Sequence, residues 1–305
     1  MPVSNHPKIR VAVIRGGPSS VYEDSLKTGD YVLKALRKMH DEYEPLDIFI
    51  SKDEEWHREG LVKEPHQALR EVDIVWNALH GKYGESGQAQ RILENLQIPF
   101  TGSNAATSAL SLDKALTKHL YQRHSLLTPA HELITERNLN DDLLINIFRN
   151  YLHPVIVKPA DGSGSIGICL AHTFFELMKA IKDTFKLSPR VVVEEFIQGD
   201  EISCTVIEEA KGEQLYALLP LSKSGKLKME ENRAVEEMAK QAHGLLKLRH
   251  YSNSDFLITP RTRKVYILET NSLPVLHEDS LTHHSLLATG WHFCDFVDHI
   301  LKLAK

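Results

Sequence analysis

Cysteine is scarce in this chain, and its few cysteines are far apart. The 305 residues include three, Cys169, Cys204 and Cys294, and no Cys-x-x-Cys pair occurs. An odd number of widely separated thiols argues against a disulfide framework and against a structural zinc site. We therefore expect buried free thiols in a reducing compartment.

The sequence also lacks an excess of positive charge and a long apolar run. Its 36 Lys and Arg against 41 Asp and Glu give a formal net charge of −5. This charge argues against general electrostatic binding to nucleic acid. The N-terminus, MPVSNHPKIR, has no apolar signal core. No apolar run approaches the roughly 20 residues of a membrane span. We expect a cytoplasmic protein that binds neither nucleic acid nor membrane.

Two familiar nucleotide-binding loops are missing as well. Gly16-Gly17-Pro18 lacks the third glycine of a dinucleotide fingerprint, so an NAD-dependent dehydrogenase is a poor interpretation. The glycine-rich loop at 161–167 has no Gly-Lys-Ser/Thr at the spacing of a P-loop. The composition itself, with 42% hydrophobic and 25% charged residues, is ordinary for a globular protein.

Strands and helices alternate through the first part of the chain. The expected strands are 8–14, 45–50, 72–76 and 98–102. After the first of them, apolar residues recur at spacings of three and four, which predicts an amphipathic helix. This alternation is typical of a parallel sheet covered on both faces.

The pattern changes near residue 103 to that of a small α+β unit. Its expected helices are 111–123, 141–151 and 174–181. The last third is expected to hold the strands 191–196, 202–207, 255–259 and 265–270, a helix over 231–248 and a terminal helix. We therefore expect three units, 1–102, 103–190 and 191–305.

The last strand pair carries the strongest chemical signal. Glu269 and Asn271 are two apart, so their side chains leave one face of the strand, and Asp255 can lie beside them across the hairpin. Oxygen ligands without His or Cys suit a hard cation such as Mg²⁺. A solvated sheet face explains the spacing equally well, but the flanking apolar residues favour a metal site that borders a core.

A lysine before a loop of small residues is the second signal. Lys158 ends an apolar strand, and DGSGSIG follows at 161–167. Backbone N–H groups of such a loop can close around phosphate while the ammonium neutralises its charge. Most glycine-rich loops are only turns, so this signal is weak by itself.

An acidic cluster follows the strand at 191–196. Glu194 and Glu195 stand near its end, with Ile197 and Glu201 beyond. An acidic residue there can accept a hydrogen bond from an adenine amino group, and a later carboxylate can hold ribose hydroxyls. Taken alone, such a cluster is more often a routine charged edge than a nucleotide site.

His80 and Glu85 follow the expected strand 72–76. Ligands gather at the carboxyl ends of strands in parallel sheets, so both residues are candidate substrate contacts. A lone histidine is more often structural.

Taken in order, these motifs resemble the D-alanine–D-alanine ligases of the ATP-grasp superfamily over nearly the whole chain. The segment EDSLKTG at 23–29 is similar to the family's Glu-x-Ser-x-x-Ser-Gly stretch, whose glutamate, here Glu23, helps to orient the first D-alanine. The loop 79–87 is similar to a signature near that substrate, and the stretch 101–118 supplies a nucleotide-binding lysine, here Lys114.

The resemblance implies a role for each candidate residue. The implied ATP-binding residues are Lys114, Lys158, Glu194, Glu195, Ile197 and Glu201. The implied metal ligands are Asp255, Glu269 and Asn271. Glu23, Ser163, Ser165 and Ser280 are the implied catalytic residues, and His80 and Glu85 the substrate contacts.

The resemblance also implies a fold and an activity. The fold is α/β and α+β: a Rossmann-like parallel-sheet domain over 1–102, a central ATP-grasp subdomain over 103–190 and a C-terminal subdomain with the metal site over 191–305. The activity is ATP-dependent joining of a carboxylate to an amine through an acyl phosphate, in peptidoglycan precursor synthesis. The implied cofactors are ATP and a pair of Mg²⁺ ions, which Mn²⁺ can replace. The implied substrates are amino acids, and the family tends to form homodimers.

Departures from the family pattern cluster on the acceptor side. The arginine two residues before the first metal ligand is Asn253 here, and the glycine that offers an oxyanion-hole amide is Val275. The substrate-side serine of the loop aligns with Gly164, between Ser163 and Ser165. Losing one charge-stabilising donor typically costs on the order of 10²–10³ in rate. Other carboxylate and amine substrates, or an ATP-binding protein with impaired catalysis, are therefore the alternatives.

The mobile lid of the family is expected to be short here, between Glu213 and Glu231. It contains no tyrosine after Tyr216. Its remaining lysines are Lys223, Lys226 and Lys228.

Overall fold

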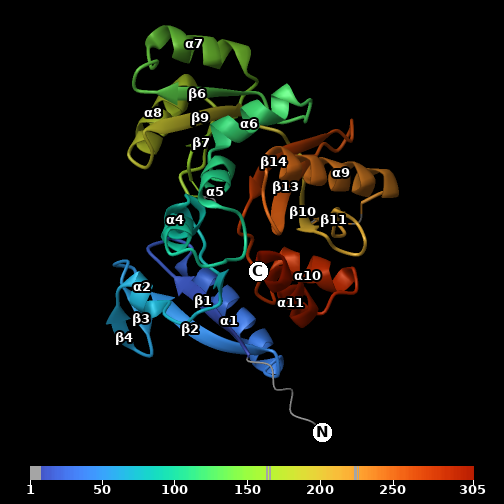
Figure 1. Ribbon diagram of the computed structural model, residues 1–305. Helices are drawn as coiled ribbons and strands as arrows, with labels where there is room; N and C mark the ends of the chain where they lie inside the picture. The colour runs from blue at the N-terminus through green and yellow to red at the C-terminus, as the bar shows by residue number, and fades with distance from the viewer. Residues whose placement is uncertain (1–7, 163, 165, 223–224, 226) are drawn as a thin grey trace.

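Three β-sheets, each with its own helices, follow one another along the chain (Figure 1). The computed structural model describes residues 8–162, 164, 166–222, 225 and 227–305. Ser163, Ser165, Lys223 and Lys226, which the sequence singled out, lie outside the described residues. The first sheet lies at one end of the molecule, and the other two face each other across the helices α5 and α6 (Figure 1).

The first sheet has a parallel centre. Its strand order is β4-β3-β2-β1-β5, and β1 pairs in parallel with both β2 and β5. The strands are β1 (Ile9–Gly16), β2 (Tyr43–Ile50), β3 (Trp56–Arg58), β4 (Leu61–Lys63) and β5 (Ile74–Asn77). The middle of β1 is fully buried, as expected of a central parallel strand. The hairpin β3–β4 extends the edge and was not expected from the sequence.

Helices surround this sheet and lead out of it. They are α1 (Tyr22–Lys38), α2 (Pro65–Ala68), α3 (Lys82–Glu85) and α4 (Gln88–Asn95). The strand expected over 98–102 is wrong: only Phe100 forms an isolated bridge, to Val75. Pro99 cannot donate a ladder hydrogen bond, and the chain then turns at Gly102 with positive φ.

The second sheet is antiparallel, in the order β6-β9-β7-β8. Its strands are β6 (His131–Thr135), β7 (Val155–Pro159), β8 (Cys169–Ala171) and β9 (Arg190–Glu195), and its helices are α7 (Asp141–Asn150) and α8 (Phe174–Phe185). The boundary expected at 190/191 falls at the start of β9. The sheet therefore groups residues 190–195 with the central unit, and the division into three units stays a prediction.

The third sheet is built on long antiparallel strands. Its order is β11-β10-β13-β14, with β12 also paired to β10. The strands are β10 (Asp200–Glu208), β11 (Leu215–Ala217), β12 (Leu221–Ser222), β13 (Tyr251–Ile258) and β14 (Val265–Asn271). The helices α9 (Met229–Leu245), α10 (Leu281–Ala288) and α11 (Phe293–Ala304) complete this part. The expected hairpin of the last two strands is confirmed.

Along the chain between the first and second sheets, the helix expected over 111–123 is two helices. These are α5 (Ala105–Leu112) and α6 (Lys114–Arg123), with a break at Asp113. Asp113 leaves the helical conformation and caps α6, since its carboxylate accepts hydrogen bonds from the N–H groups of Ala115 and Leu116. Aspartate at such a position satisfies N–H groups that have no partner inside the helix.

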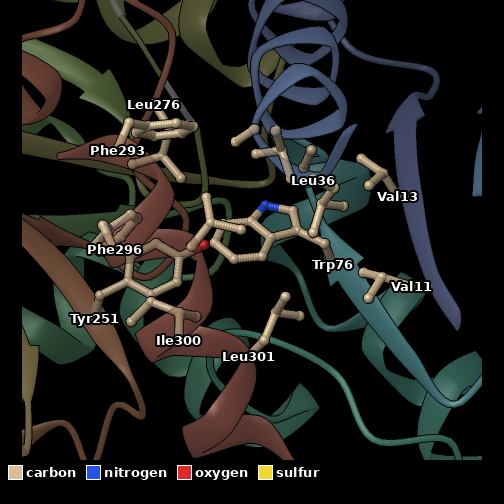
Figure 2. Packing of buried hydrophobic residues seen from close by; sticks show 14 of the residues in the cluster. Val11, Val13, Leu36, Trp76, Tyr251, Leu276, Phe293, Phe296, Ile300 and Leu301 are labelled. Carbon is tan, nitrogen blue, oxygen red and sulfur yellow. The ribbon is translucent and has the colours of Figure 1, made fainter. Parts of the chain in front are cut away.

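One hydrophobic core joins the beginning of the chain to its end. Trp76 of β5 packs against Tyr251 and Phe296, with ring centroids 6.3 Å away in both cases. Figure 2 shows this packing, with Val11 and Val13 on one side and Ile300 and Leu301 from α11 below. Across the described part of the chain, no helix has the length and apolarity needed to cross a membrane.

Candidate functional site

The expected metal ligands lie on one face of the third sheet. Asp255 on β13 is directly opposite Glu269 on β14, and Asn253 is opposite Asn271. Because residues two apart on a strand share a face, all four side chains leave the sheet on the same side. The other face is closed by a hydrogen bond of 2.8 Å between Ser254 and Thr270 and a core beneath them.

Lys114 reaches this face from the start of α6. Its Nζ lies 2.8 Å from Glu269 Oε2 and donates to the Gly162 carbonyl at 2.6 Å. Its own N–H donates to the Ala160 carbonyl at 2.8 Å. Lys114 therefore links the loop after β7 to the carboxylate of β14. Burial opposes ionisation of Glu269, but the charge and hydrogen bond of Lys114, together with the charge of Lys158, outweigh it and lower the pKa of this carboxyl.

Two more lysines meet at Glu194 of β9. Lys158 Nζ lies 2.6 Å from Glu194 Oε1, and Lys118 Nζ lies 2.9 Å from Glu194 Oε2. Lys118 also donates to the Thr128 hydroxyl at 2.9 Å. Burial lowers the pKa of Lys118 to about 8, although the Glu194 charge opposes this change. Burial alone would raise the pKa of Glu194, but the two ammonium groups outweigh it and lower that pKa.

The buried group of Lys118, Lys158 and Glu194 has two positive charges and one negative charge. A surplus charge away from water is costly unless a counter-charge arrives. The arrangement can therefore hold an anion such as a phosphate group. The sequence did not single out Lys118, yet it stands four residues after Lys114 on α6, and that spacing puts both ammonium groups on one face of the helix.

The remaining expected nucleotide residues lie along the strand end after Glu194. Glu195 is half-buried, and its carboxylate accepts from the Ala130 N–H at 2.8 Å. Ile197 is half-buried, while Glu201 on β10 is exposed. All three lie along the segment that joins the second sheet to the third.

His80 joins helix α1 to the segment after β14 through its two ring nitrogens. Its Nδ1 lies 3.0 Å from the Leu273 carbonyl, and its Nε2 lies 2.9 Å from the Thr28 hydroxyl oxygen. The Thr28 oxygen also accepts from the Leu276 N–H at 3.3 Å. Because the carbonyl can only accept, Nδ1 carries the proton and Nε2 accepts from Thr28. Burial lowers the pKa of His80 to about 4.

Glu85 is buried on α3, beside the Lys114–Glu269 pair. Its carboxylate accepts from the Gly81 N–H at 2.7 Å. Burial, and the neighbouring charge of Glu269, raise its pKa to about 7. Glu85 is therefore poised to gain or lose a proton near neutral pH. His80 and Glu85 thus border the site, and the imidazole holds the 273–276 segment in place.

A cavity of about 340 Å³ opens beside the metal face. The sheet contributes Asn253, Asp255 and Asn271, and the segments after it contribute Val275, His277 and Ser280. Ser280 caps α10, since its hydroxyl accepts from the His283 N–H at 3.1 Å. Among the described residues that line the cavity, the imidazole of His277 is the only basic group. No lysine or arginine among them stands where the family has its arginine.

Asn253 has a defined part in this cavity. Its Oδ1 accepts from the hydroxyls of Ser203 and Thr205, at 2.8 and 3.0 Å, and its Nδ2 donates to Asp255 at 3.0 Å. The amide is thereby fixed and orients an expected metal ligand. From the sequence, Asn253 is recognisable only as the residue that replaces the family's arginine. Its two hydroxyl partners come from a strand that is distant in the sequence.

The structure separates two adjacent carboxylates at the start of α1. Glu23, expected to be catalytic, is exposed, whereas Asp24 lines the cavity and lies 3.7 Å from His277. Consecutive residues on a helix point roughly 100° apart, so only one of the two can face the cavity. Asp24 is the better placed.

A divalent cation fits the chemistry of the metal face. Two carboxylates and one amide offer oxygen atoms to a hard ion, and Lys114 already neutralises one of the carboxylates. Within the described ranges no cluster of three or more His, Cys, Asp and Glu has metal-binding geometry. The metal ligands expected here include only two residues of those types, Asp255 and Glu269. The third expected ligand, Asn271, is an amide.

Family models match most of the chain. The model described as "D-ala D-ala ligase C-terminus" matches residues 120–225 and 220–302, and the one described as "D-ala D-ala ligase N-terminus" matches residues 58–103. A curated relative, the D-alanine–D-alanine ligase A of Clostridium perfringens, is 31% identical over 310 residues. That alignment covers 96% of this chain and 97% of the relative.

Solved structures are similar over nearly their full length. The D-alanine–D-alanine ligase from Bacillus anthracis, complexed with ATP, is 27% identical with a TM-score of 0.81, covering 97% of this chain and 96% of that one. The VanG D-Ala:D-Ser ligase from Enterococcus faecalis is 23% identical with a TM-score of 0.87, covering 98% and 100%. At that identity, the second likeness speaks for the fold alone.

Proposed function

Since this chain belongs to the D-alanine–D-alanine ligase family, we propose that it joins two D-alanine molecules at the expense of ATP. Membership confirms the family resemblance and the ATP-grasp fold that the motifs predicted. The product is a dipeptide precursor of peptidoglycan. The observation that carries the proposal is the meeting of Lys114 with Glu269 on the sheet face that also bears Asp255 and Asn271.

The nucleotide phosphates bind between the second and third sheets. Lys114, Lys158 and Lys118 converge there, and their surplus charge suits a polyphosphate. Support also comes from a similar solved structure, that of the Bacillus anthracis ligase, which is complexed with ATP. Glu194, Glu195, Ile197 and Glu201 follow the strand end where the adenine and ribose would lie.

Asp255, Glu269 and Asn271 would hold Mg²⁺, as a pair of ions or with Mn²⁺ in its place. Bound there, the metal would neutralise charge on the phosphates. Asn253 orients Asp255 for this role. Lys114 is paired with Glu269, and a cation that bound this carboxylate would free the Lys114 ammonium to neutralise phosphate charge.

Positioning and charge neutralisation account for most of the chemistry. The carboxylate of the first substrate attacks the γ-phosphoryl group, giving an acyl phosphate and ADP. The amine of the second substrate then attacks the acyl carbon, loses a proton, and expels phosphate. The oxyanion of that step needs donors fixed in advance, and the backbone N–H of Val275, which lines the cavity in the segment held by His80 and Thr28, is the candidate donor.

Three properties of the whole protein complete the proposal. It acts in the cytoplasm, binds no nucleic acid, and forms a homodimer as its family tends to do. The acidic net charge of −5 supports the second of these.

Release of inorganic phosphate from ATP with D-alanine tests the proposed activity. We expect turnover with D-alanine and Mg²⁺, formation of the dipeptide, and no turnover with L-alanine. Asn271→Ala should reduce the rate on the order of 10²–10³, because it removes an expected metal ligand from the charged centre. Lys264→Ala, on the exposed turn between the same strands, is the matched control.

Phosphate release without dipeptide would contradict the ligase reaction. If protein that binds ATP released no phosphate with D-alanine, the substrate assignment would be contradicted.

A further inference from the structure

A second and larger cavity lies apart from the sheet-lined site. It has a volume of about 780 Å³ and lies between α1, α10 and α11. It shares no lining residue with the cavity beside Asn253. Sites for small molecules typically measure roughly 300–1,000 Å³, so this cavity is large enough for a ligand of its own.

One edge of this cavity is cationic. Lys34, Arg37 and Lys38 line it from the last turns of α1, and Glu278 is the one carboxylate among the described residues that line it. Lys34 is engaged by Asp30 at 2.7 Å. Arg37 and Lys38 are exposed, so their charges are available at the rim. Such an edge attracts an anionic group.

Aromatic side chains form another part of the lining. The ring of Tyr31 lies 4.3 Å from that of Phe293, centroid to centroid, and 5.2 Å from the imidazole of His283 at a steep angle. The exposed side chain of Leu287 and the half-buried Cys294 extend this part. These rings offer an apolar surface against which a ligand's body can pack.

A buried polar atom borders the same cavity. His283 is 7% exposed, and its Nδ1 has no hydrogen-bond partner among the described residues. Its Nε2 lies 3.4 Å from the Tyr31 hydroxyl. A buried nitrogen without a hydrogen-bond partner is destabilising, and a polar group on a bound molecule could provide that partner.

We propose that this cavity is a second small-molecule site for an organic anion with an apolar or aromatic body. The anionic group, a carboxylate, sulfonate or phosphate ester, pairs with Arg37 and Lys38. The body packs on Tyr31 and Phe293, and a polar group on it meets His283. ATP and the ligase substrates occupy the other site, so the two sites bind independently.

Titration of the full-length protein with 8-anilinonaphthalene-1-sulfonate, an aromatic sulfonate, tests the proposal by fluorescence and by thiol protection. Cys294 lines the cavity, whereas Cys169 has similar exposure on β8 and serves as an internal reference. We expect saturable binding that shields Cys294, and not Cys169, from a maleimide reagent. Saturating ATP should leave the affinity unchanged.

The double variant Arg37→Glu/Lys38→Glu should weaken binding by at least about tenfold, because each reversal replaces an attraction by a repulsion. Lys179→Glu/Lys182→Glu on the exposed side of α8 makes the same change of charge elsewhere and should leave the affinity unchanged. The proposal would be overturned if the protein did not bind the sulfonate, or if ATP displaced it. It would also be overturned if Arg37→Glu/Lys38→Glu bound it as tightly as the wild type, or if both thiols were equally protected.

Discussion

At the scale of single residues, Glu194 is the carboxylate on which the buried lysines depend. It lies 2.6 Å from Lys158 and 2.9 Å from Lys118, and it is 2% exposed. Removing one member of a buried ionic group leaves the others without compensation, which is more costly than the group is stabilising. The loss of stability caused by each substitution should therefore increase with the number of charges that it leaves without a partner.

Glu194→Gln should therefore destabilise the protein more than Lys118→Met. The first variant leaves two ammonium groups facing a neutral amide and should cost about 3–5 kcal/mol. The second leaves Glu194 paired with Lys158 and should cost clearly less. Urea denaturation in the absence of nucleotide measures both free energies of unfolding, and the reverse order would contradict the assigned pairing.

His80 should make stability depend on pH. Burial holds the pKa of His80 at about 4, below the value of about 6.5 expected in the unfolded chain. Between these values the unfolded chain binds a proton that the native chain excludes, so native stability falls as the pH drops.

Replacing His80 by Asn should remove this dependence. The difference in free energy of unfolding between about pH 6.5 and pH 5 should shrink by about 2 kcal/mol in His80→Asn. Thr28→Val breaks the same hydrogen-bond network without removing an ionisable group, so it should lower stability and keep the slope. Equal slopes in wild type and His80→Asn would show that the imidazole is not held neutral.

The sequence allowed the placement of some site residues and not of others. Strand alternation alone put Glu269 and Asn271 on one face, because period two is a local property. The partners of Asn253 and His80 are distant in the sequence, so only the fold reveals them. The family motif points to Glu23, whereas the rotation of the helix decides which carboxylate faces the cavity, and Asp24 lines it.

At the scale of elements, the break between α5 and α6 positions Lys114. Asp113 caps α6 and also pairs with Arg190 of β9. The cap thus fixes the start of the helix from which Lys114 extends.

Asp113→Ala should lower stability and weaken ATP binding together. Loss of the cap should cost about 1–2 kcal/mol, and fraying of the first turn should raise the KM for ATP. Asn140→Ala removes the equivalent cap of α7, where the side chain accepts from the Leu143 N–H. That control should lose a similar free energy with KM unchanged; a raised KM in both variants would point to a general loss of stability.

Long periodic segments were predicted more reliably than short ones. The buried strand β1 and the hairpin of β13 and β14 follow from apolar runs bounded by turns. The sequence predicts one helix over 111–123, whereas the break at Asp113 depends on side-chain hydrogen bonds that only the fold shows. The hairpin β3–β4 has strands of three residues each, too short for periodicity to register.

At the scale of the whole molecule, the core around Trp76 connects the first sheet to the last helix. Phe296→Ala should lower the free energy of unfolding by about 3–5 kcal/mol and weaken the packing of both the first sheet and α11. Hydrogen exchange should show faster exchange in β1 and β5, although the substitution is in α11.

Ile181→Ala, in the core of the second sheet, is the matched control. It should destabilise the protein by a similar amount of about 2–5 kcal/mol and speed local exchange in β7 and β9 while sparing β1. Unchanged exchange in β1 and β5 after Phe296→Ala would mean that the two ends of the chain do not share a core.

This shared core has a consequence for biosynthesis. One face of the layer formed by β1, α1 and β5 is covered by Leu276, Phe296 and Ile300, which the ribosome synthesises long after that layer. The nascent layer must therefore carry an uncovered apolar surface until the segment that contains Phe296 and Ile300 has been made. A domain that usually folds as soon as it leaves the exit tunnel is here obliged to wait, and in that interval it is a natural client for chaperones.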